Sequence, residues 1–487
     1  MGPRAGIILA NRAYLDHDQA PRGTATPAPA QGGLLAAVRP VIAPWDGEKG
    51  TLWMGAGRGS HDRDWADAGG FEVIDTPRGP LRHRRLFFDE ATWQGHYAAV
   101  ANCFFWPLLH LVRDPLPLLT TYYPAPETPT SGQWDAYRRV NEAFARAVME
   151  EGGARERTAP NCWVHDYQLA LVPRLLREMG YGGAIGFFLH TPFPLVAAAA
   201  AFLDERATGY LRQFCEGLQG ANVAGFQSQA DLERFSFAAG SLEAARPAGS
   251  ETRLVALPVG IDADELIAVA KEAAPTPAAV AIGNGLPLVA GLERADFTKG
   301  IPERLDAVAR ALDAGSRFNY VGIASPTRVG VRSYEPLSEA LDSAAGRAAA
   351  AGERAGVSVV QLRESLPWPE VVALQRDANV VFTSSLADGM NLVPLQAAAA
   401  QSLRPPDERA VIIAGRDAGV ARAFAGFERE GLVAVDPLDA EAMERVLIEA
   451  VGGRPGRVSD RFIAEVRRRD AQSWATDFLT ELEGARC

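Results

Sequence analysis

Apolar runs of strand length alternate with helix-length segments along most of the chain, and this alternation constrains the fold more than any other feature. Four such runs occur before residue 230, at 6–10, 161–165, 184–189 and 221–226. Five more follow, at 286–290, 317–321, 357–360, 379–382 and 411–413. Strands that alternate with helices form parallel sheets with helices on both faces. The sequence therefore predicts an α/β protein.

A chain of 487 residues is too long for a single hydrophobic core. We expect two doubly wound, Rossmann-like domains that face each other across a cleft, the first over 1–260 and the second over 261–465. The last segment, 466–487, is expected to be a helix that crosses back to the first domain through Trp474 and Phe478. Ligands of such sheets bind at the carboxyl ends of the strands.

Composition limits the partners that the protein can have. The net charge of −11 argues against a broad nucleic-acid surface. No apolar run approaches the roughly eighteen residues of a membrane span, so none is expected. The four cysteines are far apart and form no Cys/His cluster, which is typical of reduced thiols in the cytoplasm and predicts no zinc site.

The turn Asp388-Gly389-Met390-Asn391 is the first candidate site. It lies between the apolar run 379–383 and an expected helix over 395–401. Backbone N–H groups at a helix start bind anions, and a carboxylate beside them accepts bonds from sugar hydroxyls. The combination suits a sugar joined to a phosphate. The simpler alternative is that Asp388 only caps the helix.

Other charged residues also follow predicted strands. Arg294 and Lys299 come after the run 286–290, where two cations could neutralise a diphosphate, although a solvated loop is the alternative. His190 follows the run 184–189; it could touch a substrate or serve only as a hydrogen-bonded structural residue. Asp166 follows the run 161–165 and could hold an acceptor hydroxyl or cap the next helix.

The first predicted strand ends in Asn11-Arg12. The diglycine Gly32-Gly33 opens a helix, and it would let the backbone approach a ligand closely.

These residues together resemble one family, the trehalose-6-phosphate synthases, which are retaining GT-B glycosyltransferases of glycosyltransferase family 20. The resemblance extends from Ile7 to Phe478. Its marks, in chain order, are Asn11-Arg12, Gly32-Gly33-Leu34, 52–55, Tyr97, Asn102, Trp106-Pro107, 165–167, 186–190, 192–194, 225–227, 258–261, Glu293-Arg294, Lys299-Gly300, Arg328 and 388–393.

The resemblance implies a role for each matching residue. The first domain would bind the acceptor and the second the nucleotide-glucose donor. The acceptor, glucose 6-phosphate, would be bound by Arg12, Tyr97, Trp106, Asp166 and Arg328. The donor would be bound by Gly33, Arg294, Lys299, Asp388, Gly389, Met390, Asn391, Leu392, Val393 and Gln396. Catalysis would involve His190, Arg294, Lys299 and Asp388.

The resemblance also implies a mechanism without a metal or other cofactor. The product would be α,α-trehalose 6-phosphate, formed with retention by attack on the same face of the sugar from which the nucleotide departs. The departing phosphate oxygen would accept the proton of the incoming hydroxyl, while the enzyme orients the reactants and stabilises the leaving diphosphate.

Three positions depart from the family pattern and leave alternatives open. Gln396, Ala387 and Gln168 stand where the family usually has glutamate, arginine and histidine. Glu364 could accept two guanine N–H groups, which favours GDP-glucose ahead of UDP- or ADP-glucose, and the alternative is that Glu364 only faces solvent. The alternatives are a glucosylglycerol-phosphate synthase, a cyclitol-joining pseudo-glycosyltransferase and a non-catalytic sugar-phosphate sensor. The oligomeric state stays open, a homo-oligomer included.

Overall fold

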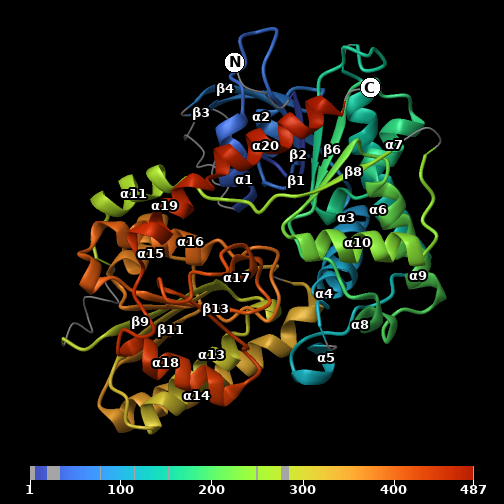
Figure 1. The fold of residues 1–487 in the computed structure, drawn as a ribbon. Helices are drawn as coiled ribbons and strands as arrows, with labels where there is room; N and C mark the ends of the chain where they lie inside the picture. Colours follow the sequence, from blue (N-terminus) through green and yellow to red (C-terminus); the bar gives the residue numbers. More distant parts are fainter. Residues whose placement is uncertain are drawn as a thin grey trace. The chain divides into compact units, whose positions relative to one another are not determined.

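Two parallel β-sheets organise the protein, each in its own structural unit (Figure 1). The structure is a computed structural model that describes residues 6–18, 33–76, 78–113, 116–151, 153–247, 251–275, 285–328 and 330–485. Unit 1 comprises Met1–Leu109, Pro126–Val259 and Ala471–Cys487, and unit 2 comprises His110–Ala125 and Gly260–Asp470. The predicted fold class, α/β with two Rossmann-like parallel-sheet domains, is confirmed.

Unit 1 contains an eight-stranded sheet with the order β3-β4-β2-β1-β5-β6-β7-β8. The strands are β1 (Ile7–Arg12), β2 (Leu52–Ala56), β3 (Phe71–Thr76), β4 (Gly79–Leu86), β5 (Cys162–His165), β6 (Ile185–Phe188), β7 (Val223–Phe226) and β8 (Arg253–Ala256). All neighbours are parallel except β3 and β4 at one edge. Strand β1 is central because β2 pairs with one side of it and β5 with the other.

The helical segments of unit 1 cover this sheet. They are α1 (Gly33–Val38), η1 (Arg39–Val41), α2 (Asp62–Trp65), α3 (Glu90–Trp93), the π-helix η2 (Gln94–Phe105), α4 (Trp106–Leu109), α6 (Ser131–Met149), η3 (Tyr167–Leu169), α7 (Val172–Glu178), α8 (Val196–Ala200), α9 (Glu205–Leu218), α10 (Gln229–Ser241) and α20 (Ala471–Gly484). Helices α8 and α9 are separate, because the Asp204 carboxylate accepts the backbone N–H of Ala207 and starts a new helix.

Unit 2 contains a fully parallel six-stranded sheet with the order β11-β10-β9-β12-β13-β14. The strands are β9 (Leu288–Arg294), β10 (Asn319–Ser325), β11 (Val359–Leu362), β12 (Val380–Phe382), β13 (Val411–Gly415) and β14 (Leu432–Val435). The sequence-based prediction ended the first of these strands at Ala290, but its pairing with β10 continues to Arg294.

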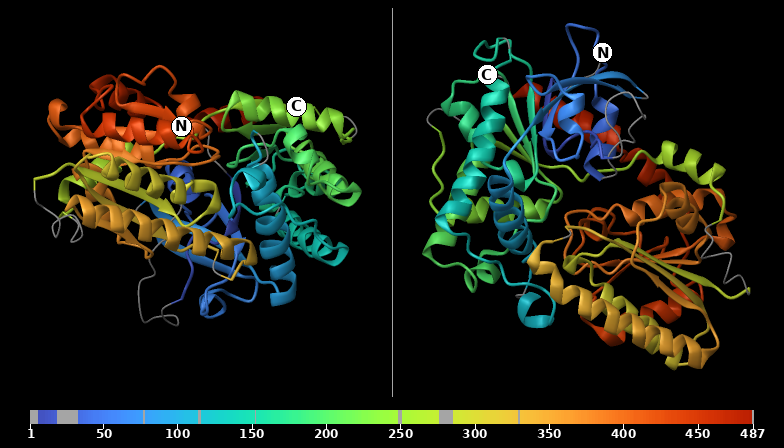
Figure 2. Two further views of the ribbon diagram at one scale, coloured as in Figure 1. Left: turned by 90° about the horizontal axis from the view of Figure 1, so that it is seen from below. Right: turned by 180° about the vertical axis from the view of Figure 1, so that it is seen from behind.

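The helical segments of unit 2 accompany this second sheet. They are α5 (Leu116–Leu119), α11 (Ala263–Glu272), η4 (Phe297–Lys299), α13 (Ile301–Asp313), η5 (Arg332–Tyr334), α14 (Glu335–Ala355), α15 (Trp368–Asp377), α16 (Val393–Ala400), η6 (Gln401–Leu403), η7 (Pro406–Glu408), α17 (Gly419–Ala423), α18 (Ala440–Val451) and α19 (Asp460–Arg468). Helices α13, α14 and α18 pack together on one face, and α11, α15 and α16 pack on the other (Figure 2). Within the described part of the chain, no helix is both long and apolar enough to span a membrane.

Two segments belong to a different unit from their neighbours in sequence. His110–Ala125 lies inside the range 1–260 expected for the first domain, yet it belongs to unit 2. Its Tyr122 hydroxyl donates to the Glu303 carboxylate, and its Tyr123 ring lies 4.9 Å from that of Phe297. At the other end of the chain, α20 packs on unit 1, where the Phe478 ring stacks 4.6 Å from Trp163. Side-chain packing therefore decides which unit each segment joins.

Each sheet has one point at which the strand order reverses. In unit 1, the chain adds β2, β3 and β4 on one side of β1 and then β5 on its other side. In unit 2, β9 is followed by β10 and β11 on one side and then by β12 on the other. Crevices that bind ligands in doubly wound folds lie at the carboxyl ends of the two strands flanking such a point. The ends of β1 and β5, and of β9 and β12, are therefore where functional residues are expected.

Candidate active site

An ion pair between Lys299 and Asp388 lies at the strand reversal of unit 2. Lys299 ends η4, shortly after β9, and Asp388 follows β12, so the two residues come from the neighbouring strand ends. The side chains are 10% and 15% exposed, so the pair is largely shielded yet still reachable. The Ser385 hydroxyl lies 3.3 Å from the same carboxylate oxygen of Asp388.

Charge around this pair keeps Asp388 ionised. Burial alone would raise the pKa of the Asp388 carboxyl, but the ammonium of Lys299 holds it below its ordinary value, and Arg294 acts in the same direction. Arg294 is the last residue of β9 and is exposed. Two cations and one carboxylate thus gather where β9 and β12 end.

The turn from Asp388 to Val393 has a fixed geometry. Asn391 adopts a left-handed backbone conformation, with φ of 62°, and its side-chain oxygen accepts the N–H of Val393 at 3.2 Å. Asn391, and not Asp388, therefore satisfies the first turn of α16, so the alternative in which Asp388 is only a helix cap does not hold. Such strained residues are often found at functional sites.

The start of α17 fixes the other side of this turn. The backbone N–H of Gly419 donates to the Asp388 carbonyl at 3.0 Å, and that of Val420 donates to the Met390 carbonyl at 2.8 Å. A Cβ atom on Gly419 would lie 1.8 Å from the Gly389 carbonyl oxygen. Only glycine permits this approach, so residue 419 helps to set the position of the whole turn.

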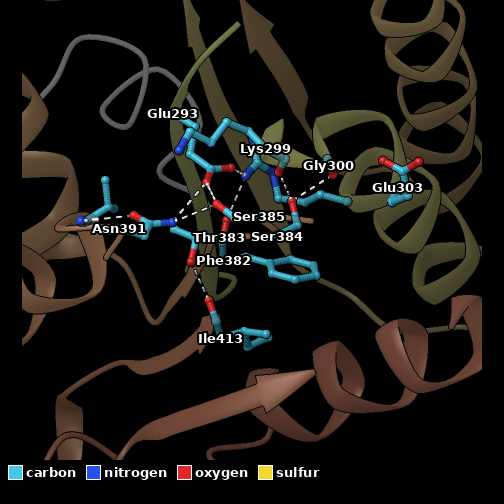
Figure 3. A network of polar contacts seen from close by, with 12 residues as sticks. Glu293, Lys299, Gly300, Glu303, Phe382, Thr383, Ser384, Ser385, Asn391 and Ile413 are labelled. Atoms are coloured by element: carbon cyan, nitrogen blue, oxygen red, sulfur yellow. Dashed lines mark hydrogen bonds and ion pairs between the residues drawn. The ribbon is translucent and has the colours of Figure 1, made fainter. Parts of the chain in front are cut away.

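A buried polar network lies beneath the turn (Figure 3). One Glu293 carboxylate oxygen lies 3.1 Å from the Ser385 hydroxyl and 3.2 Å from the Asn391 amide nitrogen. The other oxygen forms an ion pair with Arg304, which is fully buried on α13. Glu293 is among the marks of the family resemblance, but the resemblance assigns it no role. The sequence contains one signal of a role for this residue, which is a glutamate at the end of an otherwise apolar strand. Glutamate is seldom buried without a partner, so a polar partner for it was to be expected.

Two further residues of unit 2 that the resemblance assigns to substrates have protein partners. The Gln396 amide oxygen on α16 accepts from the Gln375 side chain at 3.3 Å. Arg328 forms an ion pair with the buried Asp296 and lies against the Tyr334 hydroxyl. Burial opposes ionisation, but the guanidinium of Arg328, with Arg294 and Lys299, holds the pKa of Asp296 far below its usual range.

At the strand reversal of unit 1, Arg12 ends β1 and Asp166 follows β5. The Arg12 side chain is exposed and makes no hydrogen bond or ion pair with the described residues. Asp166 has a strained φ of 72°, and its carboxylate accepts the backbone N–H of His190 at 3.2 Å. Its side chain does not cap η3, so the capping alternative for Asp166 does not hold either.

His190, after β6, is hydrogen-bonded within unit 1. Its Nε2 lies 3.1 Å from Nδ1 of His165, and its ring packs beside Phe188 and Trp474. Burial lowers the pKa of His190 to about 3, so the imidazole is neutral at neutral pH. His190 is thus a hydrogen-bonded imidazole, as the structural alternative expects. If it also contacts a substrate, it does so as a neutral ring.

Tyr97 and Trp106 lie nine residues apart on the π-helix η2 and at the start of α4. An α-helix, at 100° per residue, would place them on opposite faces. The wider π-helix, whose bonds join residues i and i+5, turns less per residue and so brings the two positions nearer to a common face. The Asn102 amide donates to the Tyr97 carbonyl at 2.8 Å, and the Trp106 ring lies 5.8 Å from Tyr167.

The remaining candidate, Gly33, is the first residue of α1, while Gly32 lies outside the described residues. The candidates therefore fall into two groups. Unit 1 holds Gly33, Arg12, Tyr97, Trp106, Asp166 and His190, and unit 2 holds Arg294, Lys299, Arg328, Gln396 and 388–393. In the described ranges, no cluster of three or more His, Cys, Asp or Glu side chains could hold a metal ion.

Comparisons with known proteins find relatives over nearly the whole chain. A trehalose-6-phosphate synthase of Mycobacterium sp. (strain KMS) is 28% identical over 99% of this chain and 95% of its own length. A bifunctional trehalose-6-phosphate synthase/phosphatase of Thermoproteus tenax is 30% identical over 81% of this chain, which spans only 52% of that relative.

Among solved structures, a UDP-forming α,α-trehalose-phosphate synthase of Burkholderia xenovorans, in complex with glucose-6-phosphate, has the same fold. Its TM-score is 0.77 at 24% identity, over 99% of this chain and 100% of the other. The profile of glycosyltransferase family 20 matches residues 8–484. The resemblance found in the sequence is thereby confirmed, and the chain belongs to glycosyltransferase family 20.

Proposed function

We propose that the chain is a trehalose-6-phosphate synthase, which transfers glucose from a nucleotide-glucose to glucose 6-phosphate with retention of the anomeric configuration. The observation that carries this proposal is the grouping of Arg294, Lys299 and Asp388 at the ends of β9 and β12. It suits a donor in which a sugar and a diphosphate lie side by side. The names of the relatives support the same activity.

In this proposal Arg294 and Lys299 neutralise the charge that develops on the departing diphosphate. Asp388 is ionised at neutral pH, so it can accept hydrogen bonds from donor-sugar hydroxyls while it orients Lys299. The acceptor hydroxyl attacks the anomeric carbon as the bond to the phosphate oxygen breaks, and its proton passes to that oxygen. The enzyme supplies position and charge, and no carboxylate needs to act as a nucleophile.

The acceptor end of the proposal rests on two arginines. The exposed guanidinium of Arg12 at the end of β1 can form charge-assisted bonds to a phosphate. Asp296 and Tyr334 fix the orientation of Arg328, whose planar guanidinium suits a second phosphate contact. Tyr97 would add its hydroxyl to this phosphate site, and Trp106 and Asp166 would bind the sugar ring.

The product tests the proposal. The protein is incubated with UDP- or GDP-glucose and, in separate reactions, glucose 6-phosphate, glucose and glycerol 3-phosphate, and the products are identified by NMR. We expect α,α-trehalose 6-phosphate from glucose 6-phosphate and far less product from the other two. A main product from glycerol 3-phosphate would favour the glucosylglycerol-phosphate alternative instead. Arg294, Lys299 and Asp388 are all present, which argues against a non-catalytic sensor.

The nucleotide is the finer part of the proposal. Glu364, just after β11, is exposed and has no hydrogen bond or ion pair with the described residues, so its carboxylate is available to guanine N–H groups. The sequence thus favours GDP-glucose, whereas the Burkholderia relative is described as UDP-forming. If GDP-glucose is preferred through this contact, Glu364→Ala lowers kcat/KM for GDP-glucose but not for UDP-glucose, and the exposed control Glu339→Ala changes neither. Wild-type preference for UDP-glucose would overturn the GDP assignment.

A further inference from the structure

We infer that Glu293 is a positioning residue of the donor site, whose buried carboxylate holds the turn 388–393 in the conformation that binds the donor. The inference rests on the proposed function, because it takes this turn as part of the donor site. Glu293 does not reach the substrate: its side chain is only 2% exposed and lies beneath the turn. It acts through Ser385 and Asn391, which contact it directly (Figure 3).

Asn391 connects Glu293 to the helix that follows the turn. Its amide nitrogen lies 3.2 Å from Glu293 Oε1 and 3.0 Å from the Ser385 hydroxyl, and its amide oxygen accepts the N–H of Val393. The left-handed backbone of Asn391 is strained, and these bonds are what holds it there. Loss of the acceptor at residue 293 would remove one of the two contacts of the amide nitrogen.

Ser385 connects Glu293 to Asp388. Its hydroxyl lies 3.1 Å from Glu293 Oε1 and 3.3 Å from Asp388 Oδ2. A serine hydroxyl has one proton, so it can donate to only one of the two carboxylates at a time. Glu293 and Asp388 therefore share this donor, and the direction of its O–H affects the carboxylate that we assign to the donor sugar.

Arg304 makes a buried carboxylate possible at this position. The guanidinium of this fully buried residue forms an ion pair with Glu293 and also donates to the Tyr320 hydroxyl and to the Phe382 carbonyl, both at 3.1 Å. One oxygen of Glu293 is thus satisfied by Arg304, which leaves the other to organise the turn. A neutral side chain would leave the arginine charge buried without its partner, which is costly.

Glu293→Gln tests the inference with little change of volume. The amide keeps one acceptor oxygen but replaces the other with an NH₂ donor, which must face either Arg304 or the Ser385–Asn391 pair, so one set of contacts is lost. We expect kcat/KM for the donor to fall about 10- to 100-fold, as for other small displacements in a site, while KM for glucose 6-phosphate stays within about twofold. Calorimetric titration with UDP and with GDP should show the same loss in affinity for the nucleotide that the enzyme prefers.

Two further variants separate positioning from overall stability. Ser385→Ala removes one donor to Glu293 but leaves its pair with Arg304 intact, so we expect it to fold even if Glu293→Gln does not. It should weaken donor use, and combined with Glu293→Gln the two losses should be less than additive. The matched control is Glu303→Gln: Glu303 is a half-buried carboxylate on the same helix as Arg304, but it pairs with Tyr122 and not with the turn. We expect donor kinetics close to the wild type for this control.

The outcomes distinguish this inference from the proposed function. In one outcome the wild type is active, and the Glu293→Gln and Ser385→Ala variants melt at a lower temperature but keep the donor kcat/KM per folded molecule. This result would overturn the positioning role and leave the proposed function intact. Equal losses for donor and acceptor would also overturn it. A third outcome is that the wild type binds UDP or GDP but forms no trehalose 6-phosphate, while the variants bind the nucleotide less tightly. Glu293 would then remain a positioning residue, and the proposed reaction would be rejected. A wild type that binds neither nucleotide would overturn both.

Discussion

Arg294 is the residue on which the leaving-group assignment depends most directly. It ends β9 and is exposed, close enough to Asp388 to lower the pKa of that carboxyl. Replacing Arg294 with alanine should lower kcat by about 10²- to 10³-fold, the usual cost of losing one donor to a developing oxyanion. The measurement is initial-rate kinetics with saturating donor and acceptor. The control is Arg347→Ala, an exposed arginine of α14 that pairs with Asp306, which should not change kcat. Turnover close to the wild type in Arg294→Ala would contradict the assignment.

Arg328 is harder to test by deletion than Arg294, because removing Arg328 also leaves Asp296 without its partner. In Arg328→Ala the fully buried Asp296 carboxylate would lose its main cation, so a loss of stability is expected together with any change in acceptor binding. Arg328→Lys keeps the charge but loses the planar fork. We expect this variant to fold and to raise KM for glucose 6-phosphate by about tenfold with little change in KM for the donor. An unchanged response to glucose 6-phosphate concentration would show that Arg328 does not bind the acceptor phosphate.

At the scale of elements, α20 depends on small residues in the strands that it covers. The ring of Phe478 on α20 stacks on Trp163 of β5 and lies against β6, where a Cβ on Gly186 would come within 2.7 Å of it. Gly186→Ala should therefore destabilise unit 1 by about 1–3 kcal/mol through overpacking. Urea unfolding followed by fluorescence measures this change.

A second glycine provides the control for that experiment. Gly209 lies within α9, and a Cβ there would meet nothing within 4 Å. Gly209→Ala should stabilise the protein by up to about 1 kcal/mol because alanine is the better helix former. Equal unfolding midpoints for the Gly186→Ala variant and the wild type would mean that α20 does not pack on β6 as described.

The elements also show what could and could not be predicted from the sequence. Central strands such as β5 and β12 could be located because burial on both faces produces continuous apolar runs. Strand β4, which lies next to the edge strand β3, could not, because its sequence, GPLRHRRL, is strongly basic and only its pairing with β3 and β2 makes it a strand. The π-helix η2 has no distinct apolar period, so this helix type was not predictable from the sequence.

The candidate site was predictable to the extent that strand ends could be located. Arg294, Lys299 and Asp388 were chosen because polar residues after buried strands gather at one edge of a parallel sheet. Glu293 received no role because its partners are distant in the chain: Ser385 and Asn391 lie 92 and 98 residues away from it. Its function depends on contacts that only the folded sheet creates, and no local pattern encodes them.

For the molecule as a whole, buried histidines make stability depend on pH. Burial lowers the pKa of His83 to about 4 and of His96 to about 3, and it lowers the pKa of His165 and His190 in the same direction. Their unfolded values are near 6.5, so below that pH the unfolded chain binds more protons than the folded one. The free energy of unfolding of unit 1, which holds all four residues, should therefore decrease as the pH falls from about 6.5 toward 4.

Unit 2 should respond differently in the same pH range. Burial raises the pKa of Glu303 to about 7, so this carboxyl favours the folded state as the pH falls from 7 toward 4.5 and opposes the histidine effect. Eight of the nine tryptophans belong to unit 1, Trp368 being the exception, so tryptophan fluorescence reports mainly on unit 1. We expect its urea midpoint to be clearly lower at pH 5 than at pH 7.5. A midpoint that is constant or higher at pH 5 would contradict the burial of neutral histidines.

The central claim is that this chain joins a nucleotide-activated glucose to glucose 6-phosphate, and acceptor-dependent nucleotide release tests it most directly. Release of nucleoside diphosphate is measured from UDP-, GDP- and ADP-glucose, each with and without glucose 6-phosphate. The account predicts rapid release from at least one donor only when glucose 6-phosphate is present, with trehalose 6-phosphate formed in equal amount. If none of the three donors releases nucleotide in response to glucose 6-phosphate, the claim is wrong, although the family and the fold would stand.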